Sequence, residues 1–326
     1  MTVRTAVSWV LVAGALQSSS SLDVAKDQFE RGDYPSAIAT LSSALAESPH
    51  DARLSHWRSR CYLEQRDYAR AISDGERAVS ERPDDSEYRR WLGHAYGGAA
   101  EQARSFSLAR KVRASFEQAV QSNPSNIAAR RDLEEFYLEA PWIVGGDRRK
   151  ALDQVNAIEE LDAVAGHLAR AIYWLDAKRL DKAADEYQRV LDVRPDRIGP
   201  YLEVADFYQT RGDATKLASV VEQAARVMPS DTRLMYYKGV ALVLANRNLA
   251  EAEQFVRRYL ATAPRRSDLP SHADAHQWLG RLSEQLGNVK AAGDEYRAAL
   301  AIDPDDKSAR EALRRLEARG RGAREH

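Results

Sequence analysis

The sequence predicts an all-α protein, a right-handed superhelical α-solenoid of antiparallel helix pairs. Three observations lead to this prediction: prolines recur at intervals close to 34 residues, small and aromatic residues recur at fixed positions between them, and glycines recur where the first helix of a pair should end. A period of about 34 residues is typical of helix–turn–helix repeats that stack side by side.

The prolines set the period. Their successive intervals are 34, 41, 71, 34, 35 and 40 residues, and the interval of 71 covers two repeats, one of which lacks its proline. Proline cannot continue a helix, because it lacks an amide hydrogen and its ring clashes with the preceding turn. The Asp, Ser or Asn that follows it can cap the next helix. The series consists of Pro49, Pro83, Pro124, Pro195, Pro229, Pro264 and Pro304.

Other residue types coincide when the proline is counted as position 32. Small residues recur at positions 8, 20 and 27, and aromatic residues at positions 11 and 24. Small residues let two antiparallel helices approach closely, and aromatic rings fill the wider gaps. Glycine at position 15 supplies the left-handed conformation that ends a helix. Position 20 holds Ala37, Ala71, Ala183, Ala252 and Ala292, and position 15 holds Gly32, Gly212 and Gly287.

These residues resemble the tetratricopeptide repeat (TPR) family, whose motif has small residues at 8, 20 and 27, aromatics at 11 and 24 and proline at 32. The resemblance extends over residues 18–306. The family's tryptophan at position 4 is absent, and Trp57 and Trp91 stand at position 6 instead. Within the family, the chain resembles exported bacterial TPR proteins. The resemblance implies a non-catalytic scaffold that binds a protein or peptide ligand on its concave face.

We expect about eight repeats over residues 18–305. Insertions near 97–106, 139–147 and 264–271 interrupt the regular period. Insertions in repeat proteins map to loops, which carry function more often than helix surfaces do. The expected repeats are 18–51, 52–85, 86–126, 127–163, 164–197, 198–231, 232–266 and 267–305.

A C-terminal capping helix should follow over residues 306–319. Ala309, Ala312 and Leu316 share one face of this segment, and charged residues occupy the other. A solenoid needs such a polar-backed helix to cover its last apolar surface. Residues 320–326 are expected to form a tail.

Residues 1–17 are expected to form a signal peptide. The segment contains no acidic residue, carries Arg4 near its start, and continues into an apolar run over 6–16 that is too short to span a membrane. An export signal predicts a periplasmic or secreted bacterial protein. The alternative is an apolar helix that packs on the first repeat of a cytoplasmic protein.

The charge balance argues against nucleic-acid binding. The chain has 48 basic and 49 acidic side chains among 326 residues, whereas nucleic-acid-binding proteins carry a basic excess. A single cysteine, Cys61, rules out a cysteine-based zinc knuckle and is expected to be a small core residue. No transmembrane span is expected.

The sequence contains no motif for catalysis or for a cofactor. Gly145 and Gly146 lack the rest of a phosphate-binding motif. His272 and His276 could share one helix face, but a metal site needs three or four ligands. We therefore expect no cofactor and no enzyme activity. The alternative is an enzyme subunit that uses a metal or another ligand at the irregular loops.

Candidate partner-binding residues occupy inner-helix positions 2, 5, 9 and 12 of repeats two to four. They are Arg53, His56, Arg60, Arg90, His94 and Arg131. This basic row could hold an acidic peptide through charge-assisted hydrogen bonds. The alternative is a solvated face on which neighbouring arginines and glutamates pair with each other.

A second candidate is the loop over residues 139–147. It places Trp142, Ile143 and Val144 where a short polar turn would suffice. These side chains either fold back as a structural plug beside the preceding insertion or form an exposed contact loop.

Together these features predict a scaffold that binds proteins or peptides through its concave face and serves envelope assembly or complex organisation in a bacterium. Arginine provides 39 of the 48 basic residues, a bias that favours a source with a GC-rich genome. The alternative function is that of a cytoplasmic regulatory adaptor.

Overall fold

The computed structural model describes residues 20–322, and all regular secondary structure in that range is helical. The all-α prediction is therefore confirmed. The expected signal peptide over 1–17 lies outside the described residues, as does the end of the expected tail from residue 323.

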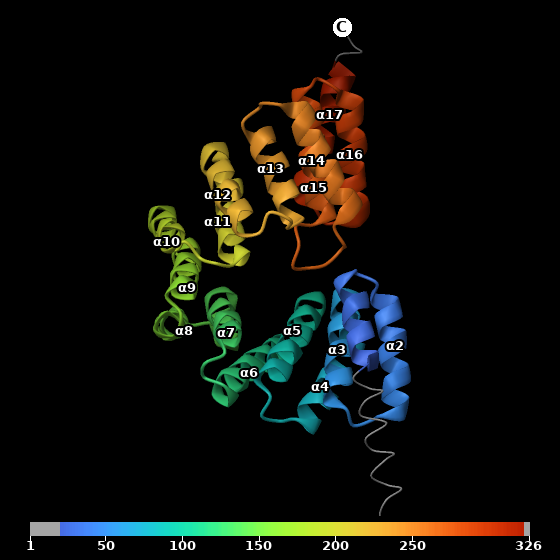
Figure 1. Cartoon of the computed structure of the whole chain (residues 1–326), viewed down its shortest axis with the longest axis vertical. Coiled ribbons are helices and arrows are strands. Elements are labelled where there is room, and N and C mark those ends of the chain that lie inside the picture. The colour runs from blue at the N-terminus through green and yellow to red at the C-terminus, as the bar shows by residue number, and fades with distance from the viewer. Residues whose placement is uncertain (1–19, 323–326) are drawn as a thin grey trace, which may run out of the picture. The chain divides into compact units, whose positions relative to one another are not determined.

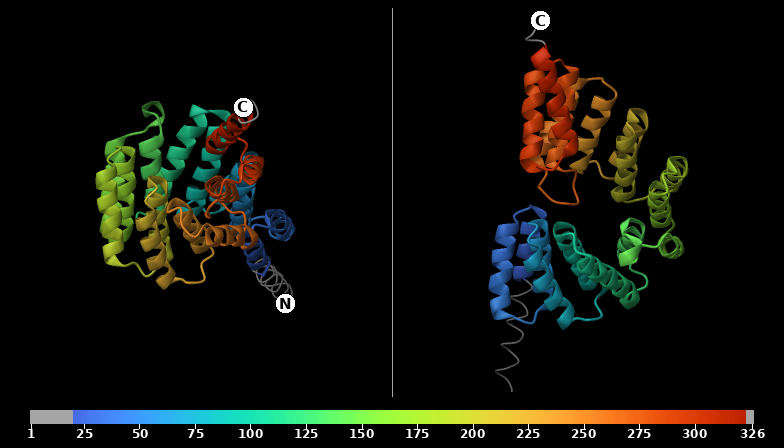
Figure 2. Two further views of the ribbon diagram at one scale, coloured as in Figure 1. Left: turned by 90° about the horizontal axis from the view of Figure 1, so that it is seen from above. Right: turned by 180° about the vertical axis from the view of Figure 1, so that it is seen from behind.

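Consecutive helices form antiparallel pairs joined by short turns (Figures 1 and 2). Before the turn at 194–197 the helices are 20–30, α2 (Tyr34–Glu47), α3 (Ala52–Glu64), α4 (Tyr68–Glu81), α5 (Ser86–Ala103), α6 (Phe106–Ser122), α7 (Ile127–Glu139), the 3₁₀ turn η1 (Trp142–Val144), α8 (Arg148–Leu161), α9 (Ala163–Asp176) and α10 (Leu180–Val193). After it they are α11 (Ile198–Arg211), α12 (Ala214–Val227), α13 (Arg233–Leu244), α14 (Leu249–Thr262), α15 (His272–Gln285), α16 (Val289–Ile302) and α17 (Lys307–Gly322).

The turn inside a repeat is built in one way almost throughout the described chain. A residue with positive φ ends the first helix, and the amide of the next residue donates to a carbonyl five residues back, as Asp33 does to Gln28 and Asp67 does to Tyr62. This is the Schellman arrangement, which satisfies carbonyls at a helix end. Glycine was expected there, yet four repeats use a larger residue. The positive-φ residues are Gly32, Arg66, Arg104, Lys178, Gly212, Asn246 and Gly287.

The core forms where small residues of one helix face rings of its partner. A Cβ atom added to Gly93 would lie 2.4 Å from the Phe116 ring, and one added to Gly280 would lie 2.5 Å from the Tyr296 ring. Glycine is therefore required where the two helices approach most closely. The five alanines at position 20 are fully buried, as the close-approach argument predicts.

The chain divides into two compact units, Met1–Asp192 (unit 1) and Val193–His326 (unit 2). The junction lacks the capping residue found before α3, α5 and α7. Arg194 has a positive φ of 55°, and Arg197 at the N-cap of α11 cannot accept a hydrogen bond from the helix.

The last helix covers the end of unit 2. Ala309, Ala312 and Leu316 of α17 are buried against Ala292 and Tyr296 of α16. None of the helices in the range 20–322 is long and apolar enough to cross a membrane. In unit 1, Cys61 is a buried core residue, and burial raises the pKa of its thiol to about 12.

Candidate functional site

The six basic candidates come from the first helices of three successive repeats. Arg53, His56 and Arg60 lie on α3, Arg90 and His94 on α5, and Arg131 on α7. α3 contacts α5, and α5 contacts α7, so these residues belong to adjacent helices. We call this set the inner row.

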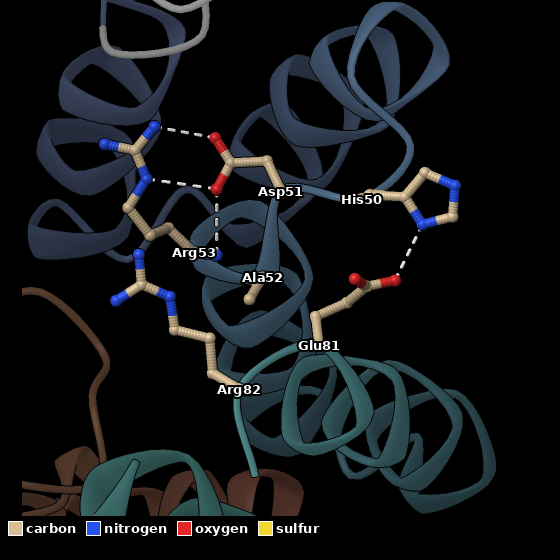
Figure 3. Close-up of a pocket in the computed structure, with 6 residues that line it drawn as sticks. All are labelled: His50, Asp51, Ala52, Arg53, Glu81 and Arg82. Carbon is tan, nitrogen blue, oxygen red and sulfur yellow. Dashed lines mark hydrogen bonds and ion pairs between the residues drawn. The ribbon is translucent and has the colours of Figure 1, made fainter. Parts of the chain in front are cut away.

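Arg53 is held by the aspartate that caps its own helix. The Asp51 carboxylate accepts the Arg53 backbone amide, and it accepts Nε and Nη2 of the same residue at 3.0 and 2.7 Å. Figure 3 shows this pair beside Ala52, with Arg82 extending to the same side. These residues line a pocket of about 310 Å³ together with His50 and Glu81, whose side chains pair with each other at 2.7 Å.

His56 is not available at the surface. Its ring is buried and stacks on Tyr88 at a centroid distance of 4.7 Å. Burial, together with the charges of Arg60 and Arg90, lowers the pKa of His56 to about 3. Burial therefore removes His56 from the predicted contact residues, since it is a neutral core side chain.

Arg90 and His94 share one carboxylate. Asp132 on α7 accepts Arg90 Nε at 2.6 Å and lies 2.7 Å from His94 Nε2. Glu87 accepts a second bond from Arg90 at 3.2 Å. Part of the basic row is thus neutralised by neighbouring acids, as one of the two sequence interpretations allowed.

Arg60 has a different environment. Its guanidinium carbon lies 4.1 Å from the ring centroid of Trp57, 4.2 Å from that of Trp91, and 4.9 Å from that of Phe29. Arg60 makes no ion pair within residues 20–322, and its buried Nε has no hydrogen-bond partner there. Burial lowers the pKa of this guanidinium, but arginine remains charged in proteins.

One cation beside Trp57 was not among the residues predicted from the sequence. Lys26, on the 20–30 helix, lies 5.5 Å from the Trp57 ring centroid. Lys26, Trp57, Arg60 and Trp91 therefore alternate cation and indole over three successive repeats, and we call them the cation–aromatic ladder. The signal was present in the sequence, because Trp57 and Trp91 occupy the same position in successive repeats with Arg60 between them.

Arg131 borders a buried carboxyl group. Glu134 is 1% exposed, and neither of its carboxyl oxygens has a hydrogen-bond partner in the described chain. Burial raises the pKa of Glu134 to about 8, although the charges of Arg131 and Arg170 act in the opposite direction. Glu134 occupies position 8, where Ala171 and Ala205 stand in later repeats.

The 139–147 loop is closed by its own backbone. The amides of Val144 and Gly146 both donate to the Pro141 carbonyl, at 3.0 and 3.2 Å. Gly145 has a φ of 112°, and a Cβ atom there would lie 2.0 Å from Nη1 of Arg113. The glycine pair is thus explained by close packing.

The three apolar side chains of this loop have different environments. Val144 is buried, whereas Ile143 is exposed and Trp142 is 84% exposed. Val144 also lines a pocket of about 510 Å³ with Phe106, with Phe136 of α7 and with other residues of α5, α6 and the two insertions. The loop therefore combines a plug, at Val144, with an exposed tip, at Trp142.

The remaining histidine candidates have partners within unit 2. His272 Nε2 lies 3.1 Å from the Ala263 carbonyl oxygen, and His276 Nδ1 lies 2.7 Å from a Glu295 carboxylate oxygen. Within residues 20–322, no group of three or more His, Cys, Asp or Glu side chains is placed to hold a metal ion.

Known structures share this architecture. A TPR protein from Parabacteroides merdae ATCC 43184 is 14% identical with a TM-score of 0.50, over 82% of this chain and 98% of that one. A chain of the APC/C hetero-tetramer Cut9–Hcn1 is 14% identical with a TM-score of 0.52, over 92% of this chain and 56% of that one. Such identities concern the fold alone. No curated protein sequence matches the chain.

The tetratricopeptide repeat family model matches residues 22–86, 144–201, 212–267 and 265–307, which together exceed half of the chain. The unmatched stretch 87–143 contains the third repeat, with its insertion, and the exposed Trp142. The recurring helix pairs, the turn geometry and the matched segments agree, and the chain belongs to the tetratricopeptide repeat family.

Proposed function

We propose that this protein is a scaffold without catalytic activity that captures an acidic segment of a partner protein on the inner row of unit 1. TPR repeats mediate protein–protein interactions, and the proposal assigns that role to the first helices of repeats two to four, with Lys26 added from repeat one. Their concave face is where the family resemblance places a ligand.

The observation that carries this proposal is the state of Arg60. Asp51 pairs with Arg53, and Asp132 pairs with Arg90 and lies 2.7 Å from His94 Nε2. Arg60 and Lys26, in contrast, make no ion pair within residues 20–322. An acidic side chain of a partner would gain charge-assisted hydrogen bonds from these two cations without breaking an existing ion pair.

A double variant, Arg60→Gln with Lys26→Gln, tests this proposal because it removes both cations. We expect the partner to be lost from affinity capture in extracts of the native host, as quantified by mass spectrometry. Arg110→Gln, an exposed arginine on α6, is the matched control. Partner recovery equal to that of the wild type in the double variant, with unchanged circular dichroism, would reject the inner row as the binding site.

The setting of this function is a separate part of the proposal. We propose a periplasmic or secreted protein of the bacterial envelope, supported by the apolar segment within residues 1–17. N-terminal sequencing of the protein from its host tests this: a chain that begins at Met1 would instead support the cytoplasmic adaptor.

A second contact surface is supported by Trp142. A large apolar side chain that is 84% exposed on a loop closed by backbone hydrogen bonds is presented to solvent without a partner in the described chain. Exposed aromatic residues beside apolar pockets mark interaction sites. Capture with Trp142→Ala, compared with Arg110→Gln, tests whether this loop contributes to partner binding.

A further inference from the structure

Two pockets, one in each unit, are lined by residues of the same short sequence motif. The sequence Pro-x-Asp-x-Arg occurs at 49–53 and again at 229–233. Arg233 binds Asp231 through Nε and Nη2 at 2.9 and 2.7 Å, which repeats the geometry of Arg53 on Asp51. Each pair lines a pocket, of about 310 Å³ in unit 1 and about 340 Å³ in unit 2.

In unit 2 the chain itself supplies a carboxylate to this pocket. Arg266 lines the pocket beside Arg233, and its Nε donates to Asp268 at 2.8 Å. The charges of both arginines act to lower the pKa of Asp268. Asp268 belongs to the 264–271 insertion, so the extra residues of this repeat place an acid on Arg266 in the pocket that Arg233 also lines.

In unit 1 the second arginine has no such acid. Arg82 lies on the same side of the pocket as Arg53, while Glu81 turns to His50 on the other side of Ala52 (Figure 3). Arg82 is exposed and makes no ion pair within residues 20–322.

The acid is absent from this pocket because the segment between α4 and α5 has no insertion. Besides Asp51 and Tyr88, Asp23 on the 20–30 helix also acts on Arg53 by its charge.

We infer that the pocket between Arg53 and Arg82 binds an aspartate or glutamate side chain of the partner, in the position that Asp268 takes in unit 2. This inference rests on the proposed function for the nature of the ligand, an acidic protein segment. We infer a carboxylate ligand because Asp268, which lines the corresponding pocket of unit 2, is a carboxylate. Arg82 suits a carboxylate because its guanidinium offers parallel N–H donors. Arg53, whose Nε and Nη2 bind Asp51, adds the donors of Nη1 on the other side of the pocket.

The test uses the full-length protein and N-acetylglutamate amide as the carboxylate probe, followed through the arginine side-chain Nε–H signals by NMR. We expect saturable shifts at Arg82 and Arg53 in the wild type. The Arg53 signal should report an affinity about tenfold weaker in Arg82→Gln, from the loss of one charge-assisted contact, and no change in the control Arg77→Gln. Inorganic phosphate forms the second arm of the titration.

Asp268→Ala supplies the decisive comparison. Removing the internal carboxylate should create a second binding site, reported by new saturable shifts at Arg266. Absence of saturable shifts at Arg82 in the wild type, or at Arg266 in Asp268→Ala, overturns the inference. Tighter binding of phosphate than of the carboxylate overturns the assignment of the ligand.

The two proposals fail separately. Capture that survives Arg60→Gln with Lys26→Gln rejects the inner row, while the titration at Arg82 still reports on the pocket. Conversely, capture that depends on Arg60 with no probe binding at Arg82 leaves the proposed function in place and rejects the carboxylate pocket.

Discussion

Arg60 is half-buried and Glu134 is buried in unit 1, neither makes an ion pair within residues 20–322, and their surroundings differ. Arg60 lies between the rings of Trp57 and Trp91, whose faces attract a cation. Glu134 is almost fully buried, and its carboxyl oxygens have no hydrogen-bond partner in the described chain. Aromatic rings offer a carboxylate no equivalent attraction.

The difference teaches how this fold keeps or removes a buried charge. A guanidinium cannot lose its proton in the accessible pH range, so it must be held by its neighbours. A buried carboxyl group can take up a proton instead, and this is why burial raises the pKa of Glu134 to about 8. Arg60 therefore keeps its charge and can bind an acidic ligand, whereas Glu134 makes the stability of the fold depend on pH.

The largest expected effect is on the Glu134 side of this comparison. Below pH 4.5, the ordinary pKa of a glutamate, both the folded and the unfolded state bind the proton, and the group adds no pH dependence to stability. Between that value and about pH 8 only the folded state binds it, so stability falls as pH rises and then levels off. We expect a total loss of roughly 2–5 kcal/mol.

Glu134→Gln and Glu134→Ala test this pH dependence, because neither side chain ionises. Urea unfolding at pH 5, 7 and 9 should show a smaller loss of stability with pH in both variants than in the wild type. Glu160→Ala, an exposed position on α8, should retain the wild-type slope. Parallel pH profiles for the wild type and Glu134→Gln would contradict the assigned environment.

The second effect concerns the rings around Arg60. Trp91→Ala should lower the free energy of unfolding by about 3 kcal/mol, through lost burial and lost cation–π attraction. Combined with Arg60→Met in a double-mutant cycle, it should reveal a coupling of about 1–2 kcal/mol. Coupling near zero would show that the indole rings do not hold the guanidinium.

The sequence predicts the repeats but not these two environments. The spacing of prolines and small residues follows from contacts inside one helix pair, and it predicts the helix pairs that the structure shows. The pairing of Arg53 with Asp51 is also local, two residues apart, and could have been recognised. The ladder joins residues of three repeats, and Arg60 looks like any basic inner position until Trp57 and Trp91 are placed around it. Glu134 falls at a position that small residues occupy elsewhere.

A smaller effect is expected at a turn that touches neither group. Arg66 is exposed and adopts a φ of 58°, where Gly32 and Gly212 stand in other repeats. Arg66→Gly should raise the free energy of unfolding by about 0.5–1 kcal/mol, because glycine adopts this conformation without steric cost. The reverse change, Gly212→Ala, should lower it by about 1 kcal/mol. Urea unfolding measures both, and effects of equal sign would contradict this view of the turn.

The smallest effect should come from an apolar side chain that has no partner to lose. Trp142 is 84% exposed at the tip of the loop, whereas Val144 of the same loop is buried. We therefore expect substitutions at the two residues to differ in their effect on stability. Trp142→Ala should change the free energy of unfolding by less than about 0.5 kcal/mol, as expected of a surface substitution. Val144→Ala should lower it by about 1–2 kcal/mol through lost burial. A cost at Trp142 equal to that at Val144 would mean that the indole packs against the protein in solution, and the second contact surface would have to be abandoned.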